Sequence, residues 1–140
     1  MEIGLVVIFG LGFWLALGAI WLIFSKPREK VDKEVLLRWR VSREKVKVLL
    51  AEVDLDKQKQ ALVEADKLLD NILRTKVKGK DMGTRLKMAK GYFDFSLYQQ
   101  LWQAHKLRNR IVHEVGVEVK KKELSRAGEI LLKGCKILGL

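Results

Sequence analysis

Both histidines of the chain lie in one short stretch, Ala104–Glu114, together with an arginine and an asparagine. On a helix, His105, Asn109 and His113 follow one another at four-residue steps and drift by only about 80° in total, so they form one polar stripe. An imidazole titrates near neutral pH, and a guanidinium such as that of Arg108 grips phosphate in fork geometry. These residue types could together carry out acid–base chemistry beside a phosphate group.

Arg108 falls about 40° from the centre of the apolar face of the same predicted helix. An arginine so placed must pair with an acid or emerge at an interface. Asp66 and Asp70, on an earlier predicted helix, are the candidate partners. In the alternative interpretation these residues are structural: Arg108 only forms an ion pair, and His113 only caps the C-terminal end of its helix, where a cation is favoured.

Other kinds of catalytic site are poorly represented. The sequence has no phosphate loop, no His-Glu-x-x-His pattern and no nucleophile elbow. Two histidines eight residues apart with one neighbouring glutamate offer too few ligands for a convincing metal site, so we expect no metal and no cofactor. Cys135 is the one cysteine, which excludes an intrachain disulfide, and its place on an apolar stripe predicts a core residue.

The elements that must position these residues are helices. Apolar residues recur at helical spacing, and no alternating strand pattern of useful length appears. Asp54 or Asp56 can cap the second helix, and Ser96 with Gln99 fits a capping box that opens the helix of the polar stripe. Gly79 and Gly116 are predicted helix breaks. The stripes predict an all-α bundle of four or five helices, at about 31–53, 55–73, 84–90, 96–115 and 121–138.

The first part of the chain differs sharply in composition from the rest. Ile3–Phe24 is a run of 22 residues without a charge, long enough as a helix to cross the roughly 30 Å hydrocarbon core of a bilayer. A cleaved signal peptide would need a positive start and a small-x-small cleavage site, and neither is present. The sequence therefore predicts a membrane anchor that stays attached.

Charge sets the expected orientation of this anchor. The net charge of the chain is +11, and residues 26–140 hold all 28 Lys and Arg against 16 of the 17 acids, a net of +12. Because positive residues follow the span and none precede it, residues 26–140 are expected in the cytoplasm and the N-terminus outside. We predict a single-pass protein of the inner (cytoplasmic) membrane with three parts: an anchor at 1–25, a basic juxtamembrane amphipathic helix at 26–54 and a helical domain at 55–140.

The stretch from Arg108 to His113 resembles the HEPN superfamily of helical bundles. Those proteins carry an Arg, four to six intervening residues and a His, often with a polar residue directly after the Arg. Here four residues separate Arg108 from His113, Asn109 takes the polar place, and a final amphipathic helix follows, as in that superfamily. The resemblance covers roughly 61–138 and also includes the stretches Ala65–Asp70 and Gly83–Lys87, as in small bacterial proteins with an anchor and a HEPN-like tail.

The resemblance implies metal-independent RNA cleavage by a homodimer. In that scheme His113 handles the proton of the ribose 2′-hydroxyl or of the leaving oxygen, Arg108 stabilises the phosphorane charge, and Asn109 orients the pair. An antitoxin protein is a further implied partner. The cations expected to attract the RNA backbone, with one histidine, are Lys76, Lys78, Lys80, Arg85, Lys87, Lys90 and His105.

A second hypothesis comes from the same residues. HEPN-like domains also include members thought to act as binding or dimerisation modules. If Arg108 serves only to pair with an acid, the chain is a non-catalytic membrane scaffold whose domain dimerises or binds a protein partner. Fold alone does not decide between these functions.

Overall fold

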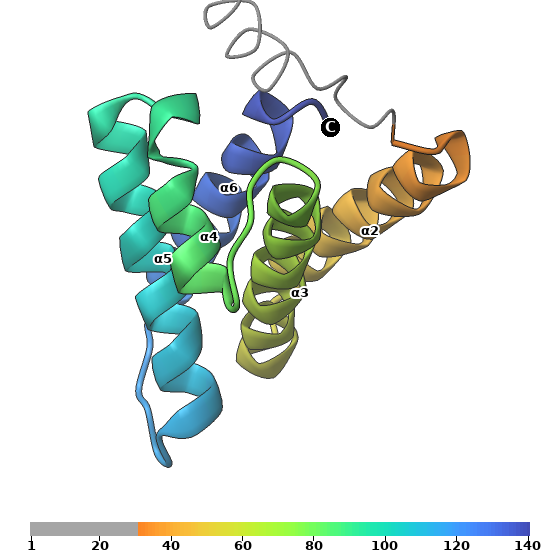
Figure 1. Cartoon of the computed structure of the whole chain (residues 1–140). Coiled ribbons are helices and arrows are strands. Elements are labelled where there is room, and N and C mark those ends of the chain that lie inside the picture. The colour runs from red at the N-terminus through yellow and green to blue at the C-terminus, as the bar shows by residue number, and fades with distance from the viewer. Residues whose placement is uncertain (1–30) are drawn as a thin grey trace, which may run out of the picture. The chain divides into compact units, whose positions relative to one another are not determined.

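The computed structural model describes residues 31–140, and Figure 1 shows the arrangement of their helices. Val31–Leu140 forms one compact unit. The predicted membrane anchor at 3–24 lies outside the described residues. Within 31–140, no helix combines the length and the apolar character that crossing a membrane requires.

The described residues form an all-α bundle, which confirms the all-α part of the predicted fold. Five α-helices and one short 3-10 helix follow one another, and residues 31–140 contain no strand. The elements are α2 (Lys33–Ala51), α3 (Leu55–Arg74), α4 (Met82–Met88), η1 (Lys90–Tyr92), α5 (Phe95–His113) and α6 (Lys121–Ile137).

Aspartates begin four of the five helices. The Asp54 carboxylate accepts a hydrogen bond from the Asp56 N–H at 2.8 Å, which confirms one of the two predicted caps of α3. The capping box predicted at Ser96 is wrong, because Asp94 is the N-cap of α5 and accepts from the Leu97 N–H at 2.8 Å. The other two aspartate caps are Asp32 and Asp81.

The core lies around α3, which packs against α2, α4, α5 and α6. Its buried apolar side chains include Leu62, Leu69 and Ile72, and Cys135 of α6 is fully buried among them, as predicted. Burial raises the pKa of the Cys135 thiol to about 12. The α3 helix is therefore the scaffold on which side chains from α4 and α5 are positioned.

Two glycines of α6 allow its neighbours to approach closely. A Cβ at Gly128 would lie 2.7 Å from Leu50 Cδ2 of α2, and one at Gly134 would lie 2.9 Å from Leu101 Cδ2 of α5. The α2 helix is also fixed to α3, because the Gln58 side chain donates to the Leu50 and Glu52 carbonyls at 3.1 and 2.7 Å. Helix α2 is thus a packed member of the bundle.

Candidate functional site

Four polar side chains from α3 and α5 close into a ring, which we call the Asp66 ring. His105 Nδ1 lies 2.9 Å from Asp66 Oδ1, and Asn109 Nδ2 lies 3.2 Å from His105 Nε2. Arg108 donates from one terminal nitrogen to Asn109 Oδ1 at 3.0 Å, and its Nε lies 3.5 Å from Asp66 Oδ2. The predicted pairing of Arg108 with an α3 acid is confirmed, and its partner is Asp66.

The contacts of the Asp66 ring are consistent with one protonation pattern. If neutral His105 carries its proton on Nδ1, it donates to Asp66 and its free Nε2 accepts from the Asn109 amide. The amide oxygen of Asn109 then faces the Arg108 guanidinium as an acceptor. Both ring nitrogens of His105 are therefore engaged inside the Asp66 ring.

The members of the Asp66 ring differ in how exposed their side chains are. The Asp66 and His105 side chains are 6% and 10% exposed, whereas the Arg108 side chain is 26% exposed. Arg108 Nε is buried and has no hydrogen-bond partner among the described residues, so its contact with Asp66 is an ion pair at longer range. The ring therefore holds the guanidinium beside a buried carboxylate while part of it reaches solvent.

His113 lies apart from this ring. It is the last residue of α5 and is exposed. It stands five positions after Arg108, so the two side chains leave α5 in directions about 140° apart. Of the three residues predicted to be catalytic, the structure brings Arg108 and Asn109 together and places His113 on another side of the same helix.

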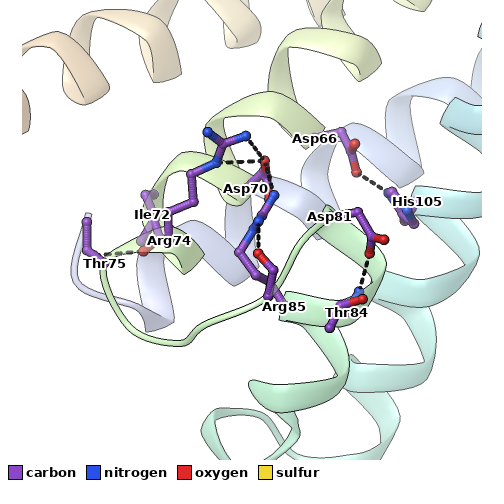
Figure 2. A network of polar contacts seen from close by, with 10 residues as sticks. Asp66, Asp70, Ile72, Arg74, Thr75, Asp81, Thr84, Arg85 and His105 are labelled. Atoms are coloured by element: carbon purple, nitrogen blue, oxygen red, sulfur yellow. Dashed lines mark hydrogen bonds and ion pairs between the residues drawn. The ribbon is translucent and has the colours of Figure 1, made fainter.

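A second carboxylate, one turn further along α3, holds α4 and the loop before it. Figure 2 shows Arg85 of α4 between Asp70 and the loop backbone. Its Nε and one terminal nitrogen donate to the two Asp70 oxygens at 2.6 and 2.9 Å, and the other terminal nitrogen donates to the Gly79 carbonyl at 2.6 Å. Arg74 also donates to Asp70, at 3.0 and 3.2 Å. We call this group the Asp70 clamp.

The Asp70 clamp removes Arg85 from the set of surface cations predicted to bind RNA. The Arg85 side chain is only 6% exposed and is engaged at all three nitrogens. Gly79 lies so close to α4 that an added Cβ would be 2.9 Å from the backbone nitrogen of Arg85. This close approach explains the glycine better than the predicted helix break does. Of the other predicted residues, His105 is buried in the Asp66 ring, Lys76 is half-buried, and Lys78, Lys80, Lys87 and Lys90 are exposed.

A groove between α5 and α6 lies on the face of α5 that carries Arg110. Its volume is about 530 Å³, and an apolar floor that includes Leu107 and Ile130 is bordered by polar side chains. His113 follows Arg110 by three residues and so lies near the same face of α5. The lining cations and glutamines are Lys106, Arg110, Arg126, Gln99, Gln100 and Gln103.

The two networks were predictable from the sequence only in part. Asp66 and Asp70 are four residues apart, so they share one face of α3, and both were candidate partners of Arg108. The pairing of Arg85 with Asp70 and of His105 with Asp66 was missed, because His105 and Arg85 had been grouped with surface residues by type. A buried position for His105 could have been suspected from its spacing of four from Leu101, which lies in the core.

Comparisons of this chain with protein-family models, with curated proteins and with solved structures give no match. Among residues 31–140, no three His, Cys, Asp or Glu side chains lie close enough together to hold a metal ion. The functional argument therefore depends on the geometry of the Asp66 ring, on His113 and on the distribution of charge.

Proposed function

We propose that this chain is a single-pass membrane protein whose HEPN-like helical domain binds RNA at the cytoplasmic face and cleaves it without a metal ion, as a homodimer. The observation that carries the proposal is the position of Arg108. The Asp66 ring orients its guanidinium, and 26% of the side chain remains exposed for a phosphate.

The dimer follows from the directions of the two reacting groups. Arg108 and His113 of one copy point about 140° apart on α5, so they cannot both contact one phosphodiester from the same helix face. A second copy could supply the missing group, with Arg108 of one copy beside His113 of the other. The free imidazole in this scheme is His113, because both nitrogens of His105 are engaged in the ring.

Charge supports RNA as the ligand. Exposed lysines at 78, 80, 87 and 90 and the cations of the α5–α6 groove present positive charge on several helices. Neutralising phosphates with such groups releases counterions, so binding should weaken steeply with added salt. The antitoxin partner remains part of this proposal, as a protein that would mask the same cations.

The test uses the full chain in detergent micelles with a labelled single-stranded RNA and excess EDTA. We expect cleavage that leaves a 2′,3′-cyclic phosphate, and a loss of about 100-fold or more in His113→Ala, since general acid–base catalysis contributes that much. Lys133→Ala removes an exposed cation from α6 and is the matched control, expected to cleave normally. Unchanged cleavage in His113→Ala, or no cleavage by the natural chain, contradicts the ribonuclease.

A second candidate function, a non-catalytic scaffold, is favoured by one specific contact. Arg108 already has partners inside its own chain, Asp66 and Asn109, and these could account for it fully. The scaffold hypothesis expects Arg108→Ala to lower the melting temperature while RNA binding by the natural chain is absent. Dimerisation measured by analytical ultracentrifugation, without any RNA binding or cleavage, would favour this function over the first.

A further inference from the structure

Helix α2 has two apolar faces, of which only one is covered by the bundle. Val46 and Leu50 are buried against the other helices. On the opposite side Leu37, Val41 and Val48 are 61%, 63% and 65% exposed. At about 100° per residue these three side chains fall within roughly 40° of one another, so they form one narrow stripe along the helix.

Cations border this stripe on both sides. Arg38 and Lys45 lie about 40–100° from its members on one side, and Arg40 and Lys47 lie about 60–120° away on the other. All four are exposed. In α2 as a whole six Lys and Arg face two acids, Glu34 and Glu44. An apolar stripe flanked by Lys and Arg is the pattern of a helix that lies in the plane of a membrane interface.

The geometry points to the surface of an anionic bilayer as the occupant of this face: we infer that α2 lies along the membrane with Leu37, Val41 and Val48 inserted among the lipids. Three of the flanking cations form ion pairs, Arg38 with Glu34, Lys45 with Glu64 and Lys47 with Glu44. On the membrane all four cations would lie at the level of the phosphate headgroups. The sequence supports this occupant, because only eight residues lie between the uncharged segment 3–24 and the first residue of α2. That short connection would hold α2 near the same bilayer.

A second copy of the chain fits this face less well. A helix pair would use the seam Leu37, Val41, Glu44 and Val48, and it would place two Glu44 side chains at its centre. Two α2 helices would also bring an excess of positive charge together. At a lipid surface Glu44 would lie on the same side of α2 as the stripe, where its contacts with Arg43 and Lys47 at 3.1 Å offset its charge.

The inference is tested with the full chain in nanodiscs of neutral phosphatidylcholine, with or without phosphatidylglycerol. Val48→Cys carries a polarity-sensitive fluorophore, and the buried Cys135 does not compete for the label. Glu129→Cys, on the exposed side of α6, is the matched control. We expect quenching by acrylamide to fall about threefold at position 48 in the anionic discs, with a blue shift in emission, and to stay constant at position 129.

A charge variant sharpens the test. Replacing Arg38, Arg40, Lys45 and Lys47 with Gln should abolish the protection of position 48, whereas Gln at four exposed lysines of α6 (Lys121, Lys122, Lys133 and Lys136) should not. Full quenching at position 48 in both lipids overturns the inference. So does disulfide formation between two Val48→Cys copies in the anionic discs, which would assign the face to a second chain. A chain that does not copurify with the discs overturns the inference together with the membrane anchor.

Discussion

The Asp66 ring and the Asp70 clamp use two carboxylates on one face of α3, a single turn apart, yet they are built differently. Asp70 binds Arg85 through both oxygens at 2.6 and 2.9 Å, and both side chains are almost buried. Asp66 meets Arg108 at 3.5 Å and shares its other oxygen with a histidine. The saturated pair fixes a loop, whereas the pair of Asp66 with Arg108 is longer and leaves the Arg108 side chain 26% exposed.

The largest expected effect is at the Asp70 clamp. Asp70→Ala leaves Arg85 buried without its carboxylate, and removing one partner of such a pair costs about 3–5 kcal/mol of the free energy of unfolding. Urea denaturation of the full chain in micelles, followed by circular dichroism, measures the loss. Arg74→Ala removes the 62% exposed partner of the same carboxylate and should change stability by less than about 0.5 kcal/mol. Equal effects of the two variants would contradict the clamp.

The matched substitution one turn earlier should cost less. Asp66→Ala leaves His105 and Arg108 without their shared acceptor, and an unsatisfied buried donor costs about 1–3 kcal/mol. The same urea denaturation gives the comparison directly. If Asp66→Ala destabilises the chain more than Asp70→Ala, the contrast between a structural clamp and a looser ring is wrong.

A smaller loss of stability is expected when Arg108 of the Asp66 ring is replaced. Arg108→Ala should lower the free energy of unfolding by about 1 kcal/mol, because the pair is long and the side chain is partly solvated. A double-mutant cycle with Asp66→Ala isolates their coupling. Arg110→Ala, which removes a 52% exposed cation two residues later, is the control and should be close to neutral in stability. A coupling energy near zero would mean that Asp66 does not hold Arg108.

The smallest effect at neutral pH concerns Cys135, which is fully buried in the core. Its folded pKa of about 12 lies above the ordinary thiol value of 9.0, chiefly because burial disfavours the thiolate. The folded state therefore binds the proton more tightly, so stability is unaffected below pH 9 and falls as pH rises from 9 towards 12. The thiol should not react with a disulfide reagent at pH 8 until urea unfolds the chain. Rapid reaction of the native chain would contradict this burial.

The helices themselves were largely predictable from the sequence. Apolar spacing located all five, and the end of α6 and the cap of α3 were predicted within a residue or two. The start of α5 was misplaced because Ser96 matched a capping pattern, whereas Asp94, two residues earlier, supplies a carboxylate to the same turn. The N-cap is the residue whose side chain accepts a hydrogen bond from the free N–H groups of the first helical turn. Several polar residues near a helix start can be in a position to do so.

The exposed stripe of α2 was not predicted. Apolar spacing predicted a helix at about 31–53 and a single amphipathic pattern, without the second apolar face at Leu37, Val41 and Val48. A helix with apolar residues on two sides gives no clear sign of which side the bundle will cover. That choice depends on where α3 and α6 pack, which the local sequence does not state.

By itself, the sequence determined what is local: the helical periodicity, the uncharged segment at 3–24, the excess of positive charge and the short list of acids that could meet Arg108. Only the tertiary structure decided which acid takes which cation. Asp66 and Asp70 share a face of α3, so they differ mainly in their position along the helix axis. The register in which α4 and α5 pack against α3 brings Arg85 to one and His105 and Arg108 to the other. Contacts between residues 15 to about 40 positions apart are fixed by this packing, because a shift of one turn would exchange the partners.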